Sequence, residues 1–216
     1  MAEEKLNKRT QDALTAIEDA VFDLLEEKTF DSITARDIYN QAKVNKMTFY
    51  KYHSNKFDAL AKAFTSRVDI EFAQRFSVEE ALFEEGDYDE SIYRGLIFVV
   101  EFIERYRAQF AHLVSPNGDL PRDVVFSALF SNYRIYFSAI VGGDLSKENE
   151  YLVYFLFGSF RSLYDCQMQQ LAKNPKGAFP KQDAEKACHI IARSFKEVLL
   201  ALRDDLKDKL LESSNQ

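Results

Sequence analysis

The sequence predicts an all-α protein of about nine helices. Apolar residues recur at three- and four-residue spacing along most of the chain, which is the period of an amphipathic helix. The 216 residues include only seven Gly and four Pro, so few positions favour the tight turns that β-sandwiches and barrels need. No Gly-rich loop follows a strand pattern, which argues against the nucleotide-binding folds.

The first predicted helix covers residues 7–27, and Phe30 and Ile33 close the loop that follows it. Its apolar residues fall on one face at helical spacing. They are Leu14, Ile17, Val21, Leu24 and Leu25. We expect the following short helices to pack on this face and to form a small N-terminal helical domain with it.

Two short helices joined by a tight turn are predicted next. The Thr34 hydroxyl is placed to cap the first of them, and Ile38 and Ala42 form an apolar i, i+4 stripe along it. Lys43 and Val44 interrupt that period. Asn45 is then placed to cap a second helix that extends from residue 46 to about residue 53.

The second short helix combines one inward aromatic residue with an outward face of polar, basic and aromatic side chains. Phe49 is placed to pack on the first helix, and the side chains left facing outward are Lys46, Thr48, Lys51 and Tyr52. A helix of about two turns must be held by tertiary packing. Such a helix exposes hydrogen-bond donors, a hydroxyl group and an aromatic ring, which suit the major groove of DNA and its flanking phosphates.

This part of the chain resembles the DNA-binding region of the TetR family of bacterial helix-turn-helix transcription regulators. The shared residues read T-A-R-D-I from Thr34, A-x-V from Ala42, K-x-T-x-Y-x-Y from Lys46 and N-K-x-x-x-L from Asn55. The resemblance covers about residues 14–64, roughly a quarter of the chain.

Two residues depart from the family pattern, which has Gly at the turn position of Lys43 and Phe at the position of His53. A left-handed Lys43 would cost about 1 kcal/mol relative to Gly, which a packed domain tolerates. His53 either packs as the missing Phe does or donates to a phosphate, and packing is the interpretation that we favour.

The resemblance implies an N-terminal helix-turn-helix domain, residues 1–66, joined by a linker helix to a ligand-binding and dimerisation domain, residues 67–216. It implies a repressor that binds an inverted-repeat operator as a homodimer and responds to a small apolar or aromatic effector. The residues that it assigns to DNA contact are Thr34, Lys46, Thr48, Tyr50, Lys51, Tyr52 and Lys56. Tyr50 has packing against the first helix as an alternative role.

Further helices are predicted along the rest of the chain. The linker helix begins near Asn55 and continues toward Phe76. The next segment extends from about residue 91 to 114 with a break near Arg107, and Pro121 lies in the first turn of a helix that extends to about residue 141. The last two long helices cover about residues 146–172 and 181–210.

Charge is distributed unevenly along the chain, whose formal net charge is −7. Residues 32–67 contain seven Lys and Arg against two Asp, a local balance of +5, whereas residues 68–216 contain 17 basic and 24 acidic residues, a balance of −7. Phosphate contacts supply much of the affinity for DNA. A locally basic segment in an acidic protein therefore fits a DNA-binding function, although scattered charge alone is also typical of a solvated face.

Cysteine and histidine usage favours neither a disulfide framework nor a metal site. Cys166 and Cys188 are too few for a disulfide framework, and we interpret them as buried small residues, with a redox pair as the alternative. His53, His112 and His189 lie far apart in the sequence. We expect no metal and no cofactor. No signal segment or membrane-length apolar run is recognisable, so we expect a cytoplasmic protein.

An aromatic cluster in the second predicted domain could line a ligand cavity. For each residue a plain core position is the competing interpretation, since an aromatic stripe at helical spacing is more often core. The buried hydroxyls of Tyr residues need partners, which favours them as ligand contacts. The residues predicted to contact an effector are Phe102, Tyr106, Phe126, Phe130, Tyr133 and Tyr154.

The resemblance further implies that the last two long helices form the dimer interface. Arg161 and Asp165 lie at i, i+4 there and form either a surface salt bridge or an interface pair. A second hypothesis is a co-regulator that keeps the fold but acts through protein contacts without reading DNA. No motif places a nucleophile, base and orienting carboxylate together, so we expect no enzyme.

Overall fold

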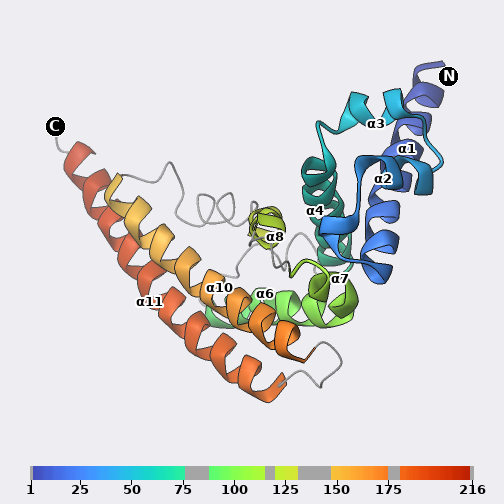
Figure 1. The fold of residues 1–216 in the computed structure, drawn as a ribbon. Coiled ribbons are helices and arrows are strands. Elements are labelled where there is room, and N and C mark those ends of the chain that lie inside the picture. The colour runs from blue at the N-terminus through green and yellow to red at the C-terminus, as the bar shows by residue number, and fades with distance from the viewer. Residues whose placement is uncertain (1, 76–87, 115–119, 131–146, 175–180, 215–216) are drawn as a thin grey trace. The chain divides into compact units, whose positions relative to one another are not determined.

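A computed structural model of the protein describes residues 2–75, 88–114, 120–130, 147–174 and 181–214 (Figure 1). Within these residues the chain is all-α, with nine α-helices, one short 3₁₀ helix and no strand. The predicted fold class is therefore confirmed. None of the helices in these ranges combines the length and the apolar character needed to cross a membrane.

The helices of the first half are short apart from two. They are α1 (Ala2–Glu27), the 3₁₀ helix η1 (Phe30–Ser32), α2 (Ala35–Gln41), α3 (Lys46–Tyr52) and α4 (Lys56–Arg75). α1 begins earlier than residue 7, the predicted start. The preceding residues A-E-E-K-L are good helix formers, and acidic residues at a helix N-terminus interact favourably with its dipole.

The second half contains five described helices. They are α6 (Tyr88–Arg105), α7 (Arg107–Ala111), α8 (Leu120–Phe130), α10 (Lys147–Lys173) and α11 (Lys181–Ser214). The predicted break near Arg107 is confirmed, as is the placement of Pro121 in the first turn of its helix. The predicted continuation of that helix to residue 141 lies outside the described residues.

The described chain forms two compact units. The N-terminal unit contains α1, η1, α2, α3, α4 up to Glu71, α7, α8 up to Leu129 and the end of α10 from Met168. The C-terminal unit contains the end of α4, then α6, most of α10, and α11. The predicted domain boundary between residues 66 and 67 stays a prediction.

α1 forms the centre of the N-terminal unit, packing against α2, α3 and α7. Its residues Ile17 and Leu25 are fully buried, as are Ile38 of α2 and Phe49 of α3. Each of these side chains contributes about 1.5 to 3 kcal/mol by its burial. The apolar face predicted from the sequence is thus the face that holds the short helices in place.

α7 joins this core through both aromatic and backbone contacts. The ring of Phe110 packs edge-on against Phe64 with centroids 5.2 Å apart. The backbone N–H of Phe30 donates to the carbonyl of His112 at 3.0 Å, and His112 Nδ1 lies 2.7 Å from the carbonyl oxygen of Leu25. The loop that precedes α2 is therefore fixed by a segment much later in the chain.

In the C-terminal unit α11 packs along α6. The His189 ring stacks on Tyr93 with centroids 3.8 Å apart and planes 7° from parallel. Between α10 and α11, Phe160 and Phe195 pack edge-on at 4.9 Å. Aromatic pairs of this kind add about 0.5 to 1.5 kcal/mol beyond their area burial, so both helix pairs are held by specific contacts.

The two cysteines are free thiols in different surroundings. Cys188 is buried in the C-terminal unit, and burial raises the pKa of its thiol to about 12. Cys166 is exposed, so its predicted burial is wrong. It lies one helical turn after Ser162, which is also exposed, on a face of α10 that the described chain leaves uncovered.

Candidate DNA-binding surface

α2 begins with a reciprocal capping box. Asp37 donates its backbone N–H to Thr34 Oγ1 at 3.2 Å, and the backbone N–H of Thr34 donates to Asp37 Oδ2 at 2.8 Å. The Thr34 hydroxyl also donates to Asp37 Oδ2 at 2.6 Å. The hydrogen bonds from the side chain and backbone of Thr34 lower the pKa of Asp37. The predicted cap is confirmed, and it fixes the start of α2.

The turn after α2 places Lys43 in the left-handed region with φ 54°. The Val44 N–H donates to the carbonyl of Tyr39 at 3.0 Å, and the Lys43 N–H donates to the carbonyl of Asn40 at 3.1 Å. This pair of bonds is a Schellman motif, which usually has Gly at the left-handed position. Lys43 thus adopts the left-handed conformation that the Gly of the family pattern would adopt at lower cost, and the motif ends α2 sharply.

α3 begins immediately after this turn. Asn45 Oδ1 accepts a hydrogen bond from the backbone N–H of Thr48 at 2.8 Å, which confirms the predicted cap. Phe49 is completely buried, and its ring lies 6.2 Å from that of Tyr39 on α2. A single buried aromatic residue with a capped first turn therefore sets the orientation of this short helix.

The outward face of α3 is basic, aromatic and apolar. Lys46, Met47, Tyr50 and Lys51 are exposed, Tyr50 to 48%. The Lys46 ammonium lies 5.9 Å from the centre of the Tyr50 ring, and the Lys51 ammonium lies 5.0 Å from the centre of the Tyr52 ring. Thr48 is half-buried. The structure thus brings the predicted contact residues of α3 together on one short helix.

Tyr50 and Tyr52 differ in their surroundings. The rings of Tyr50 and Phe49 pack at nearly a right angle with centroids 5.2 Å apart, while much of Tyr50 stays exposed. Packing and DNA contact are therefore not exclusive roles for it. Tyr52 donates from its hydroxyl to Thr10 Oγ1 on α1 at 3.3 Å and is half-buried. Its predicted outward orientation is therefore only partly correct, because it also fixes α3 to α1.

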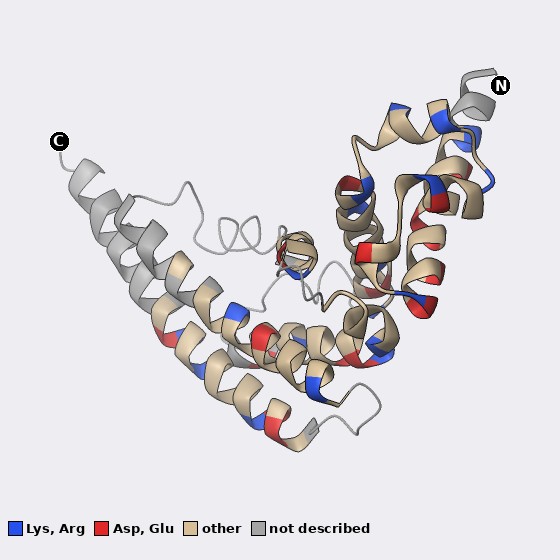
Figure 2. Ribbon diagram, in the orientation of Figure 1, with Lys and Arg blue, Asp and Glu red and all other residues tan. Residues whose placement is uncertain are grey.

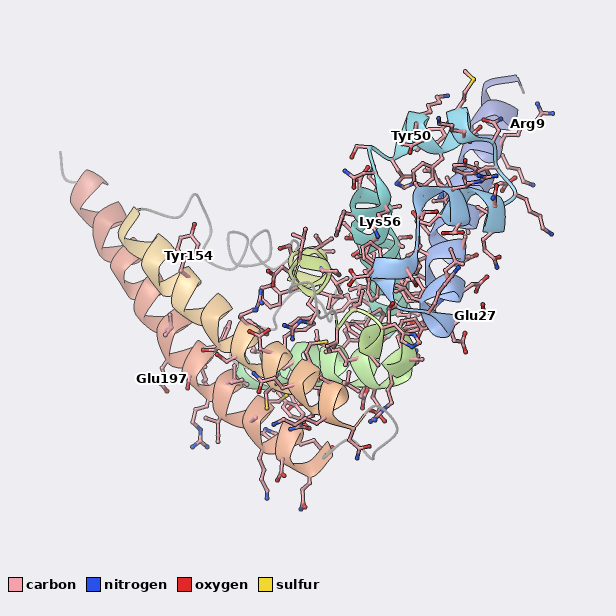
Figure 3. The ribbon with its side chains drawn as sticks, in the orientation of Figure 1. Arg9, Glu27, Tyr50, Lys56, Tyr154 and Glu197 are labelled. Carbon is pink, nitrogen blue, oxygen red and sulfur yellow. The ribbon has the colours of Figure 1, made fainter. Side chains whose placement is uncertain are left out.

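The N-terminal half of α1 adds a residue that sequence reasoning does not single out. The bond from Tyr52 to Thr10 places this half of α1 beside α3, and Arg9 is exposed next to Thr10. Figure 3 shows Arg9 and Tyr50 at the same end of the N-terminal unit. The signal in the sequence is the basic cluster of Lys5, Lys8 and Arg9 before the first apolar stripe.

Lys56, at the start of α4, points into the unit and is half-buried (Figure 3). Its ammonium donates to the carbonyl of Ile33 at 2.8 Å and to the carbonyl of Phe30 at 3.0 Å, and it lies 4.5 Å from the centre of the Phe30 ring. Burial lowers its pKa, an effect that Asp31 opposes. Two of its three N–H groups therefore hold the loop before α2.

His53, the residue after α3, is only 1% exposed, and neither ring nitrogen has a hydrogen-bond partner among the described residues. Its ring lies 5.4 Å from that of Phe49, and Nδ1 lies 4.0 Å from Asp58 Oδ2. Burial is the main cause that lowers its pKa, Lys62 adds to the effect and Asp58 opposes it. Packing, the favoured interpretation for His53, is confirmed.

Charge within the N-terminal unit is segregated. Figure 2 shows Lys and Arg around α3 and the α2–α3 turn, whereas Asp and Glu occupy successive turns along the C-terminal half of α1. Those acidic residues are Glu18, Asp19, Asp23, Glu26 and Glu27. The surface of α3 therefore presents positive charge to a polyanion, while the far half of α1 does not.

The residues predicted to contact an effector are divided between the two units. Phe102 is buried in the C-terminal unit, whereas Tyr106 and Phe126 are half-buried in the N-terminal unit, where Tyr106 donates its hydroxyl to Glu71. Tyr154 is 67% exposed and points away from α10 (Figure 3). The side chain of Phe130 and all of Tyr133 lie outside the described residues. Effector contact by this set stays a prediction.

The arrangement of α2, turn and α3 has the geometry of a helix-turn-helix protein, with a short connection and a second helix exposed on its outer face. Part of the chain is similar to a protein of Bacillus subtilis (strain 168) described as the uncharacterized HTH-type transcriptional regulator YdeS. The two are 47% identical over 51 residues, which is 24% of this chain and 26% of that protein. The chain thus matches about a quarter of the relative's length. No protein-family model matches it.

Proposed function

We propose that the protein is a sequence-specific DNA-binding transcription regulator of the TetR type. The observation that carries this proposal is the outward face of α3, where Lys46, Tyr50 and Lys51 surround a helix that Phe49 anchors from behind. A short helix of this kind fits the major groove with its N-terminal residues toward the base edges. The similarity to an HTH-type regulator supports the same function.

The side chains of α3 divide by chemistry between bases and backbone. Lys46 and Thr48, in the first turn, face base edges or the adjacent phosphates. Tyr50, Lys51 and Tyr52 contact mainly phosphates and nearby bases. The polar side chains position the helix on the duplex, and the ammonium groups supply the salt-dependent part of the affinity.

Thr34 and Lys56 contribute at the starts of α2 and α4. Their internal hydrogen bonds hold the two helix starts in place. We expect the third N–H of the Lys56 ammonium to reach a phosphate. A backbone phosphate at a helix start is stabilised by free N–H groups and by the helix dipole. Both residues therefore act first as positioning groups and second as phosphate contacts.

The protein acts as a homodimer formed through α10 and α11. Exposed apolar side chains support this proposal, namely Tyr154 on α10 and Ile190 on α11. A Cβ atom added at the exposed Gly158 would meet nothing within 4 Å, so this part of α10 accepts a close helix. Arg161 and Asp165 form a salt bridge of 2.8 Å within α10 and would lie at the edge of that interface.

A dimer requires an operator with two-fold symmetry, because two copies of α3 then face two half-sites about one helical turn or a multiple apart. An apolar or aromatic effector bound among the aromatic residues of the second half would change the separation of the two copies of α3 and release the operator. Such coupling typically amounts to about 1 to 3 kcal/mol. We propose repression, with release by the effector.

The test is a salt series of DNA affinity. Fluorescence anisotropy measures the dissociation constant of the full chain for genomic fragments, including the region upstream of its own gene, between low and physiological salt. Wild type is compared with the double variant Lys46→Ala/Lys51→Ala. Removing two lysines per subunit from the phosphate backbone flattens the slope of log affinity against log salt by about 0.9 for each phosphate that is no longer neutralised.

The matched control is Lys173→Ala/Lys186→Ala, which removes the same charge from exposed lysines on α10 and α11. Sedimentation equilibrium establishes the mass of each variant, and the control must remain at the wild-type mass. Equal salt slopes for the two double variants would refute the assignment of α3 as the DNA-reading helix. Absence of any fragment bound by the folded wild type would instead favour the co-regulator.

A further inference from the structure

Met47 is the most exposed large apolar side chain among the described residues, at 84%. It is the second residue of α3, where the Asn45 cap fixes the backbone of the first turn. Single exposed apolar residues are common on protein surfaces. Met47 differs because the half-exposed Tyr50 lies one turn away on the same short helix.

The direction of Met47 follows from the burial of Phe49. Successive residues of an α-helix are rotated by about 100°, which places Met47 and Lys51 each about 160° from Phe49. Since Phe49 points into the core, Met47 and Lys51 lie at the centre of the outward face. Of these two residues, Met47 lies in the first turn, the part of a recognition helix that meets base edges.

The side chain of Met47 offers an apolar surface with no hydrogen-bond donor. Its thioether is flexible and polarisable, which suits close contact with another apolar group. On the major-groove edge of duplex DNA the thymine C5-methyl is the apolar group that a side chain meets. Contact with a polar base edge would remove water from donors and acceptors without replacing their hydrogen bonds.

We propose that Met47 is a specificity-determining residue that recognises the C5-methyl group of a thymine in each half-site of the operator. This inference rests on the proposed DNA-binding function. Lys51 lies on the same face as Met47, and Lys46 is the exposed residue before it. The two lysines hold the helix against the phosphate backbone, while Met47 selects an A·T pair at one position. Its contribution is to sequence preference, since it carries no charge for the salt-dependent part of the affinity.

The test removes the apolar group from either side of the proposed interaction. The full chain selects a binding duplex from a pool with a randomised centre, and each thymine of the selected site is then replaced by uracil, symmetrically in both half-sites. Uracil lacks only the C5-methyl group. Dissociation constants are measured by fluorescence anisotropy at one salt concentration for wild type, Met47→Ala and the control Ile70→Ala, which removes an exposed apolar side chain from α4.

At one symmetric position, wild type binds the uracil duplex about fifteenfold more weakly than the thymine duplex. Each half-site loses one methyl group, worth about fourfold or 0.8 kcal/mol, and the two factors multiply. For Met47→Ala the same replacement changes the affinity less than about twofold. Ile70→Ala behaves as wild type does. A further pair of duplexes carries cytosine or 5-methylcytosine in place of the thymine at that position. The 5-methyl group restores part of the affinity of wild type relative to cytosine and leaves the affinity of Met47→Ala unchanged.

Two results would overturn the inference while leaving the proposed function standing. One is a selected site at which the replacement of thymine by uracil changes the dissociation constants of wild type and Met47→Ala by the same factor at every position. The other is a selected site without a constant thymine. Failure of the folded wild type to select any duplex would refute the proposed function itself. Circular dichroism of Met47→Ala establishes that the variant is folded, so that its binding reports on the side chain alone.

Discussion

Replacing Lys56 by Ala should lower the stability of the N-terminal unit markedly, although the residue belongs to a proposed contact surface. The Lys56 ammonium donates to the carbonyls of Phe30 and Ile33, and these two residues bound the loop before α2. Without the ammonium both carbonyl groups lose its hydrogen bond, and the carbonyl of Phe30 retains the bond from the backbone N–H of Ile33 at 3.1 Å. The loop then depends on its apolar contacts, on the hydrogen bond from Phe30 to His112 and on the local bond from the Ser32 N–H to the carbonyl of Thr29.

The magnitude follows from the number and kind of hydrogen bonds that the substitution removes. Hydrogen bonds to charged groups contribute about 1.5 to 3 kcal/mol each, and the half-buried position of Lys56 favours the lower end because water replaces part of the interaction. We therefore expect Lys56→Ala to lower the free energy of unfolding by about 2 to 3 kcal/mol. With a urea dependence of about 2 to 3 kcal/mol per molar, the midpoint falls by about 1 M.

Urea unfolding monitored by circular dichroism at neutral pH measures this change. Lys51→Ala is the matched control, because Lys51 is exposed on α3 and lies against the face of the Tyr52 ring. We expect the control to stay within about 0.5 kcal/mol of wild type. If the two variants unfold at the same urea concentration, Lys56 does not hold the loop. Its position at the start of α4 would then matter only for DNA binding.

Three further substitutions test the geometry around α3 by urea unfolding. His53→Phe should raise the free energy of unfolding at neutral pH by about 1 to 2 kcal/mol, because it removes two buried ring nitrogens that have no hydrogen-bond partner in the described part of the chain. Since the pKa of His53 is lowered in the folded state, the unfolded state binds protons more readily, and wild type should become less stable as the pH falls below about 6.5. A pH dependence that is the same in His53→Phe and wild type would contradict this. Lys43→Gly should raise stability by up to about 1 kcal/mol through its φ of 54°, and a decrease in stability would show that the Lys side chain matters more than the backbone strain. Thr34→Ala should cost about 1 kcal/mol by removing the capping box with Asp37, whereas an unchanged midpoint would mean that water replaces the cap.

The features around α3 that the sequence predicts correctly depend on short-range rules. Thr34 and Asn45 cap the helices that follow them within three residues, and the helical period ends at Lys43, just after the end of α2. Burial of Phe49 follows from helical periodicity. Each of these needs only the neighbouring residues and the period of a helix.

The features that the sequence does not predict depend on contacts between residues distant along the chain. The bonds from Lys56 to the carbonyls of Phe30 and Ile33 span 26 and 23 residues, and the bond from Tyr52 to Thr10 spans 42. Periodicity indicates which side of a helix faces inward but not which neighbour it meets. For the same reason the predicted burial of Cys166 is wrong, since this residue lies on an exposed face of α10.

Exposure explains why sequence reasoning does not place Met47 and Arg9 among the DNA contacts. With Phe49 inward, helical periodicity already turns Met47 outward, but an apolar residue draws no attention as a DNA contact until the structure shows how far its side chain is exposed. Arg9 becomes part of the same surface through the contact of α3 with α1. DNA contact stays a prediction for Met47 and Arg9, as it does for the residues that the sequence assigns to DNA contact.

Hydroxyl-radical footprinting of the full chain on its selected duplex tests the central claim most directly. We expect two protected stretches of DNA backbone, related by two-fold symmetry and about one helical turn or a multiple apart, and both should be absent with Lys46→Ala/Lys51→Ala. Protection that lacks this symmetry, or that the double variant retains, would contradict a dimer reading DNA through α3.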